Sequence, residues 1–392
     1  GLGNIALQSG AVYLFSNPFT TPTLYGIIGK GYIGGGNYNM TALEAGDLFG
    51  QSVSLSGTQL AVGAPSDDGL NNLVQNSGAV YLFSDSFGTT TLSGVIGKGY
   101  IGTGDYDPGS ALATGDRFGY SVSLNGIRLA IGAYGDDGFG DVAADSGAVY
   151  LLNNPYTTPS LSGIIGKGYS GAGNFDVSNL TAGDNFGSAV SLSDTQLVVG
   201  ASLDAGFANV AASSGAVYLF NTPYTAPTLS GIIGKGYTGS GNYDLSALDA
   251  SDYFGTAVSL NDTHLAVGAS GDDGLGNTLT ASGAVYLFTL TSGTGIDPAS
   301  GQTFSTNAGA DSSIAPASIT AILNTGSALT LQANNDITVA NAITTSAGGT
   351  GGALTMQAGR SILLNANITT DNGNLTLIAN DTVAHGVVDA YR

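Results

Sequence analysis

The sequence predicts an all-β protein, with a β-propeller of four-stranded blades followed by a short parallel β-helix. The first sign is a long repeat, because Ser-Gly-Ala-Val-Tyr-Leu begins at residues 9, 77, 146, 214 and 282. The second is that each unit holds short apolar runs between turn signals, without helical spacing. The third is a shorter repeat after residue 316. Fixed periods of this kind indicate architectures in which each unit packs on its neighbours.

Each long repeat predicts four strands. In the second complete unit the apolar runs are residues 120–124, 128–133, 147–152 and 160–165. Asn125-Gly126 and Asp136-Asp137-Gly138 supply turns between them. One such sheet cannot bury both faces alone, so we expect consecutive blades to pack face to face around an axis. A phenylalanine repeated in each unit is expected to wedge between blades: Phe49, Phe118, Phe186 and Phe254.

The motif around these phenylalanines resembles a known repeat. Asp-x-Phe-Gly at residues 116–119 is followed by Ser-Val-Ser-Leu at 121–124 and by Leu-Ala-Ile-Gly-Ala at 129–133. This pattern resembles the FG-GAP repeat over about residues 1–288. The resemblance implies the propeller found in integrin α chains and in many bacterial surface proteins.

The ends of this predicted propeller are incomplete. Gly1-Leu2-Gly3-Asn4 matches Gly274-Leu275-Gly276-Asn277, so the sequence begins inside a repeat and is expected to be a piece of a longer protein. No fourth strand is evident for the last unit after Phe288. The blades are therefore expected to form a five-bladed ring or part of a larger one. The end strands could pair within the chain, with further sequence or with a neighbouring molecule.

A change in composition separates a second domain. Residues 289–316 are rich in Ser, Thr, Gly, Ala and Asp and are expected to be a connector. In residues 317–392, the pattern at 328–331 returns at 353–356 and 374–377, which predicts parallel β-helix rungs. Residues 305–392 also resemble filamentous-haemagglutinin-type exoproteins, which implies secretion by a Gram-negative bacterium.

Composition excludes several classes of function. The 392 residues include 28 acidic and 8 basic side chains, giving a formal net charge of −20. This charge repels phosphate backbones and anionic membranes, so nucleic acid is not an expected partner. No apolar run reaches the roughly 18 residues needed to span a bilayer. The chain has no cysteine, which excludes disulfides, thiolate metal sites and cysteine nucleophiles.

The sequence gives little support for catalysis. His264 and His385 are the two histidines, and neither recurs in the repeat. No Ser-His-Asp order, phosphate-binding loop or paired-histidine metal motif is present. We therefore expect a protein that is not an enzyme. A glycan-active enzyme is the least favoured alternative, because it needs paired carboxylates in one cleft and these acids repeat around a ring.

Carboxylates at equivalent loops are the candidate metal ligands. Oxygen-rich loops closed by glycine can hold Ca²⁺. The alternative is that Asp-Gly simply makes and caps a turn, and the integrin-type calcium loop is not matched. The candidates are Asp67, Asp68, Asp136, Asp137, Asp204, Asp272 and Asp273.

Two further sets recur at fixed positions. Asp47, Asp116, Asp184 and Asp252 precede Phe-Gly and are expected to accept backbone N–H bonds in a turn. Lys30, Lys98, Lys167 and Lys235 lie in Gly-Lys-Gly-Tyr after the outermost predicted strand. These lysines either block edge-to-edge pairing of sheets or meet acidic loops.

The function predicted from these patterns is that of an extracellular bacterial adhesin or biofilm-matrix protein, with the propeller as contact surface and the β-helix as stalk. Its expected partner is a glycan or protein on a host or neighbouring cell, and tyrosines such as Tyr169 could stack on sugars. The alternative is a structural subunit of an extracellular fibre, joined through unpaired terminal strands.

Overall fold

The computed structural model describes residues 1–289 and 316–382, apart from residues 240, 262–263, 275–276, 278, 325, 327, 346–347 and 349–350. The chain divides into two compact units, Gly1–Leu287 and Phe288–Arg392. The predicted connector therefore lies outside the described residues, except at Thr289 and Pro316.

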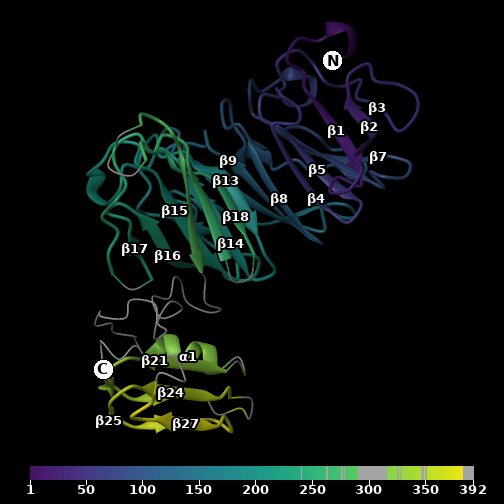
Figure 1. Ribbon diagram of the computed structural model, residues 1–392. Helices are drawn as coiled ribbons and strands as arrows, with labels where there is room; N and C mark the ends of the chain where they lie inside the picture. Colours follow the sequence, from purple (N-terminus) through teal and green to yellow (C-terminus); the bar gives the residue numbers. More distant parts are fainter. Residues whose placement is uncertain are drawn as a thin grey trace. The chain divides into compact units, whose positions relative to one another are not determined.

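Five sheets follow one another along the described part of the first unit, and we call each a blade (Figure 1). The first blade consists of β1 (Ala11–Ser16), β2 (Thr23–Gly29) and β3 (Tyr38–Asn39). The second consists of β4 (Ser52–Ser56), β5 (Gln59–Ala64), β6 (Ala79–Ser84) and β7 (Thr91–Gly97). The third consists of β8 (Ser121–Asn125), β9 (Arg128–Ala133), β10 (Ala148–Asn153), β11 (Ser160–Gly166) and β12 (Phe175–Asp176).

The last two blades repeat this order. The fourth consists of β13 (Phe186–Leu192), β14 (Gln196–Ala201), β15 (Ala216–Asn221), β16 (Thr228–Gly234) and β17 (Tyr243–Asp244). The fifth consists of β18 (Phe254–Leu260), β19 (His264–Ala269) and β20 (Ala284–Thr289). Short 3-10 turns lie in the loops at η1 (Leu2–Asn4), η2 (Leu70–Asn72), η3 (Gly109–Ala111) and η4 (Phe207–Asn209).

The four predicted strands are confirmed in the second, third and fourth blades. In the third blade β8, β9, β10 and β11 pair antiparallel in sequence order, as tight turns between neighbouring strands require. Short parallel strands then pair with the outer edge of the fourth strand, as β3 does on β2, β12 on β11 and β17 on β16. The edge of the fourth strand is thereby covered by the chain itself.

The hydrophobic core lies between blades, as the repeat predicted. Phe118 is fully buried and packs with Val80 and Leu82 of the second blade. Its ring meets Tyr150 of its own blade edge to face at 5.2 Å. Phe49, Phe186 and Phe254 are buried in the same way. The prediction that these phenylalanines wedge between blades is confirmed, because Phe49, Phe118 and Phe186 each lie in a core that their own blade shares with the preceding one.

Backbone contacts bring adjacent blades into close approach. Gly147 has φ +86°, and a Cβ there would lie 1.9 Å from the carbonyl oxygen of Phe186 in the next blade. Only glycine fits such a position. Along the first strands, the N–H of Leu124 donates to Oγ of Ser54 in the preceding blade at 2.9 Å. The same bond joins Leu192 to Ser123 and Leu260 to Ser191, so the first strands form a serine ladder from blade to blade.

The second unit is a short stack of parallel strands, which confirms the predicted β-helix rungs. One sheet consists of β21 (Leu329–Ala333), β24 (Leu354–Ala358) and β27 (Leu375–Ile378). The others are β22 (Ile337–Val339) with β25 (Ile362–Leu364), and β23 (Ile343–Thr344) with β26 (Ile368–Thr369). All three sheets are parallel, with Leu329 beside Leu354 and Leu354 beside Leu375.

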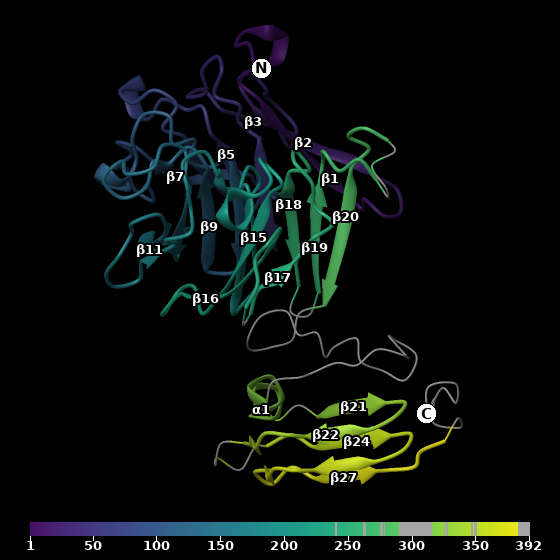
Figure 2. The same ribbon diagram turned by 90° about the vertical axis from the view of Figure 1, so that its left-hand side faces the viewer.

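One helix in this unit was not predicted. The helix α1 (Pro316–Asn324) lies beside β21, at the opposite end of the stack from β27 (Figure 2). Its Ile319 and Leu323 are buried against Leu331, Leu354 and Met356. The helix therefore covers the apolar interior at the first rung.

Candidate functional site

The first aspartate of each Asp-Gly loop is buried beneath the loop. Asp136 is 2% exposed, and its carboxylate accepts hydrogen bonds from the phenols of Tyr150 at 2.7 Å and Tyr169 at 3.0 Å. The backbone N–H of Gly138 donates to it at 2.8 Å. The same cluster joins Asp67 to Tyr81 and Tyr100, and Asp204 to Tyr218 and Tyr237. The two phenols tie the loop to the third strand and to the turn after the fourth strand, and the glycine N–H closes the loop itself.

Burial controls the protonation of this cluster. Loss of water raises the pKa of Asp136 to about 6, although bonds from Tyr150, Gly138 and Tyr169 oppose the rise. Burial likewise raises the pKa of Tyr150 well above its ordinary value, so the phenol keeps its proton and donates it. The pKa values of Asp67 and Asp204 are raised by burial too.

The second aspartate of each predicted metal pair lies nearer to solvent. Asp137 accepts the backbone N–H of Asp145 at 2.7 Å, and Asp68 and Asp273 make the equivalent bond. Within the described ranges, no group of three Asp, Glu or His side chains is placed to share a metal ion. The seven candidate aspartates thus lie in four separate loops, and calcium binding there stays a prediction.

The aspartates before Phe-Gly hold a turn, as predicted. Asp116 accepts the N–H of Ala113 at 2.7 Å. Asp47, Asp184 and Asp252 accept the same bond from the residue three positions earlier. Burial raises the pKa of Asp116 to about 7, and the nearby charge of Asp136 adds to the rise. Each blade from the second to the fourth therefore buries two neighbouring acids.

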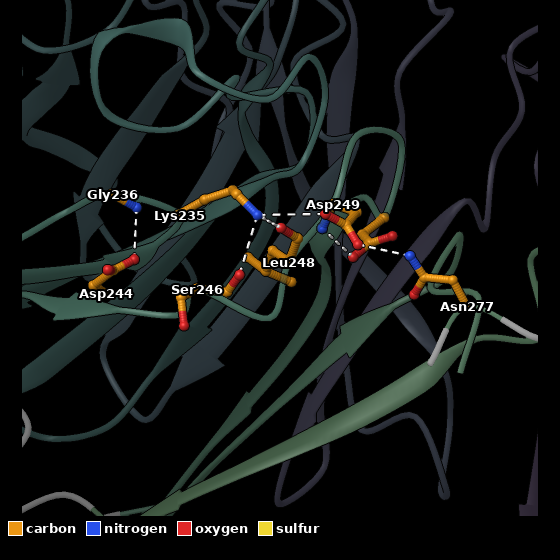
Figure 3. A network of polar contacts seen from close by, with 8 residues as sticks. Lys235, Gly236, Asp244, Ser246, Leu248, Asp249 and Asn277 are labelled. Atoms are coloured by element: carbon orange, nitrogen blue, oxygen red, sulfur yellow. Dashed lines mark hydrogen bonds and ion pairs between the residues drawn. The ribbon is translucent and has the colours of Figure 1, made fainter. Parts of the chain in front are cut away.

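The repeated lysines hold a neighbouring loop (Figure 3). Nζ of Lys235 donates to the carbonyl oxygens of Ser246, at 3.1 Å, and Leu248, and meets the carboxylate of Asp249 at 3.4 Å. Asp249 in turn accepts the side-chain N–H of Asn277 at 2.7 Å. Lys30, Lys98 and Lys167 also donate to loop carbonyls eleven or more residues later. The lysines are therefore not needed to prevent pairing between sheet edges, because short parallel strands already pair with the outer edge of the fourth strand.

The same loops expose large apolar side chains at equivalent positions. Phe139 and Val142 of the third blade are 64% and 63% exposed. Matching residues occur in the loops of the first, second and fourth blades, and we call the whole set the loop row. The loop row consists of Leu2, Ile5, Leu70, Leu73, Phe139, Val142, Phe207 and Val210.

Two sets of backbone bonds fix the loop row. The N–H of Phe139 donates to the carbonyl of Lys167 at 2.8 Å, and Leu2, Leu70 and Phe207 make the same bond to Lys30, Lys98 and Lys235. Each loop also accepts a bond from the next blade, as Ala144 does from Gly183 at 2.9 Å. The loops therefore follow one another along the same edge of successive blades, and backbone hydrogen bonds tie each loop to its own blade and to the next one.

The buried clusters support the exposed row directly. The ring of Phe139 packs edge to face on Tyr169 at 5.9 Å, and Phe207 packs on Tyr237 at 6.0 Å. The hydrogen bond to Asp136 thus positions the ring of Tyr169, and that ring in turn supports the ring of Phe139. Tyr169 is only 5% exposed, so its ring cannot stack on a sugar, contrary to the expectation from the sequence.

Sequence reasoning missed the loop row, although its signal was present. An apolar residue follows Gly69, Gly138 and Gly206 in loops that otherwise read as polar turns.

Of the two histidines, His264 is exposed at the start of β19, and His385 lies outside the described residues.

A comparison with protein families identifies the repeat. The FG-GAP repeat matches residues 43–83, 109–152, 177–220 and 245–288. Residues 43–288 carry four FG-GAP repeats. The FG-GAP match spans the second to the fifth blade, and FG-GAP repeats are typical of extracellular proteins. In the described part of the chain, no helix combines the length and apolar character that a membrane span requires.

Solved structures show only weak similarity. The computationally designed Ika4 protein is 11% identical, with a TM-score of 0.29 over 62% of this chain and 91% of its own. A putative exo-β-1,3-galactanase from Bifidobacterium bifidum s17 is 10% identical, with a TM-score of 0.22 over 65% and 92%. An endo-arabinanase from Bacillus licheniformis is 11% identical, with a TM-score of 0.20 over 61% and 92%. No curated protein matches the chain significantly.

Proposed function

We propose that this chain is part of a non-enzymatic bacterial adhesin or matrix protein outside the cell, with the loop row as its contact surface and the C-terminal unit as its stalk. The observation that carries this proposal is the loop row itself. Large apolar side chains exposed at the same position of four blades gain little for folding, and exposed apolar patches mark interaction sites. The bonds to the lysine carbonyls keep the row in place, which lowers the entropy lost on binding.

Two sequence features support the extracellular setting. FG-GAP repeats are typical of extracellular proteins. The resemblance of residues 305–392 to filamentous-haemagglutinin-type exoproteins favours a secreted stalk. The formal charge of −20 favours a neutral or cationic glycan or protein partner over nucleic acid.

Surface adherence tests this function. A variant with serine at Leu70, Leu73, Phe139, Val142, Phe207 and Val210 should bind cultured epithelial cells and surface-attached bacteria at least about tenfold more weakly, through loss of the apolar contact. Its melting temperature should stay close to that of the native chain. The control is Ile127→Ser, which removes a 65% exposed residue from the hairpin at the other end of β9. Equal adherence of the loop-row variant and the native chain contradicts the proposal.

A second candidate function is a structural subunit of an extracellular fibre. It is favoured by the fifth blade, where Val285 and Leu287 of β20 are 69% and 80% exposed. Such a face suits a neighbouring blade.

A further inference from the structure

The third blade carries an aromatic pair where the other blades carry smaller side chains. The rings of Tyr120 and Tyr134 meet edge to face, with their centroids 4.5 Å apart. Tyr120 lies directly before β8 and Tyr134 directly after β9, so both lie at the end of the blade that bears the Asp-Gly loop. The equivalent positions hold Gln51 and Pro65, Ser188 and Ser202, and Thr256 and Ser270. The repeat therefore folds without this pair.

The two rings also lie outside the interblade core. Among the described side chains, the core shared by the second and third blades includes Phe118 and Tyr150, but neither Tyr120 nor Tyr134. Both rings are partly exposed instead. Two partly exposed aromatic rings in contact offer a surface on which the apolar face of a ligand can pack.

Arg117 supplies polar groups beside the pair. Its carbonyl oxygen accepts the N–H of Tyr120 at 3.0 Å. Its Nη1 donates to Oγ of Ser66 at 2.6 Å and to Oδ1 of Asn76 at 3.0 Å, both in the second blade. In the described structure its side chain makes no other hydrogen bond, so the N–H groups on Nε and Nη2 can serve a ligand. The equivalent positions hold Leu48, Asn185 and Tyr253.

The charges around the pair favour an uncharged ligand. Burial raises the pKa of the Tyr134 phenol, the guanidinium of Arg117 opposes this rise, and the charge of Asp145 adds to it. Tyr134 therefore lies near one positive and one negative side chain. Asp116 directly precedes Arg117, and the whole chain has a formal charge of −20, so an anionic ligand would be repelled. Hydroxyl groups can accept from a guanidinium and donate to a carboxylate, so a neutral ligand rich in hydroxyls fits both.

We propose that Tyr120, Tyr134 and Arg117 form a binding site for one unit of a neutral saccharide. The apolar face of the sugar ring packs on the tyrosines, and the guanidinium donates to its hydroxyl oxygens. Aromatic walls with a few placed polar groups are the usual composition of small-ligand sites. This inference deepens the proposed function, on which it rests, by naming the chemistry of one partner.

Replacing the site by the residues of the fourth blade tests the proposal. The triple variant Arg117→Asn, Tyr120→Ser and Tyr134→Ser introduces the side chains of Asn185, Ser188 and Ser202, which the same fold already accommodates. The probes are neutral oligosaccharides of glucan, mannan and chitin, and acidic oligosaccharides of alginate. The full chain should bind at least one neutral probe in isothermal titration, and the triple variant should bind it at least about tenfold more weakly.

Two further variants make the result specific to the site. Tyr134→Ser alone leaves the bonds between Arg117 and the second blade in place, and it should still weaken binding at least about threefold. Tyr253→Asn is the matched control, because Tyr253 occupies the position of Arg117 in the fifth blade and is also partly exposed. This control should bind the neutral probe as the native chain does. Melting curves verify that each variant is folded.

Three results would overturn the site. These are no binding of any neutral probe by the native chain, tighter binding of the acidic probe, and native affinity in both the triple variant and Tyr134→Ser. A native chain that adheres to cells through the loop row but binds no neutral probe overturns the saccharide site and leaves the proposed function standing. Loss of the proposed function is measured separately, by equal adherence of the loop-row variant and the native chain.

Discussion

The phenol of Tyr150 donates a hydrogen bond of 2.7 Å to the carboxylate of Asp136, and both residues are buried. The two lie fourteen residues apart, at the start of a loop and in the strand that follows it. The bond therefore closes the loop that carries Phe139 and Val142. The second and fourth blades repeat it between Tyr81 and Asp67 and between Tyr218 and Asp204.

Removing this phenol should destabilise the fold. Tyr150→Phe keeps the ring but leaves a buried carboxylate with one donor fewer, so the free energy of unfolding should fall by about 2 kcal/mol. Urea denaturation measures the change. The matched control is Tyr253→Phe, whose phenol makes no hydrogen bond in the described structure and whose loss should cost less than about 0.5 kcal/mol. If the two variants lose the same free energy of unfolding, the bond between the phenol and the buried carboxylate does not stabilise the fold.

Stability should decrease from acid to neutral pH. Burial raises the pKa of Asp116 to about 7 and those of Asp47, Asp136 and Asp184 to about 6, against about 3.9 in an unfolded chain. Between about pH 4 and pH 7 the native state therefore binds more protons than the unfolded state, and the free energy of unfolding falls as pH rises. The melting temperature should be higher at about pH 5 than at about pH 8.

A single variant can isolate one of these acids. Asp116→Asn removes an acid whose pKa is raised to about 7 and should flatten the pH profile. Asp194→Asn changes the net charge equally at an exposed position and should leave the slope unaltered. A melting temperature that rises from acid to alkaline solution contradicts this account of the buried acids.

Close approach of blades makes Gly147 sensitive to any side chain. Gly147→Ala places Cβ against the carbonyl oxygen of Phe186 and should cost about 3 kcal/mol or more. Gly126→Ala is the control, because φ there is also positive, at +57°, but no atom lies within 4 Å of the added Cβ. Its cost should be about 1 kcal/mol. Thermal and urea unfolding compare the two variants. A similar loss of stability in both would show that the positive φ alone, and not the contact with Phe186, causes the loss.

Calcium at the Asp-Asp-Gly loops remains open to a direct test. Since Asp136 already accepts three donors, we expect a bound cation to depend on Asp137, which accepts one backbone N–H. The melting temperature of the native chain should be higher in excess calcium than in excess chelator, and Asp137→Asn should reduce this difference by removing one of the equivalent loops. Identical melting in calcium and chelator counts against these sites.

Local pattern predicted the strands and the interblade phenylalanines. Alternation at residues 120–124 and the turn at Asn125-Gly126 are set by neighbouring residues, and β8 follows them. A phenylalanine recurs beside glycine in every complete unit, as Phe118 does in the second, and this recurrence predicted that its side chain is buried. These features depend on interactions within one unit and its immediate neighbours.

The environment of the acids could not be predicted this way. Asp136 and Tyr169 are 33 residues apart, and only folding shows that the phenol turns the carboxylate into a buried anchor. An exposed Asp-Asp-Gly turn and a buried one have the same sequence. Helix α1 was missed for a related reason, because residues 317–324 were assigned to the β-helix repeats and only the folded chain shows Ile319 and Leu323 packed on the first rung.

The serine ladder bears on how such proteins change over evolutionary time. Ser54, Ser123 and Ser191 each receive the same N–H from the following blade, so no junction is distinguishable from the next. Unequal crossing-over between the DNA segments that encode these similar units would insert or delete whole blades while keeping the same serine bond at each junction. Gene variants should therefore differ in length by steps of 68 or 69 codons, the spacing of the repeat.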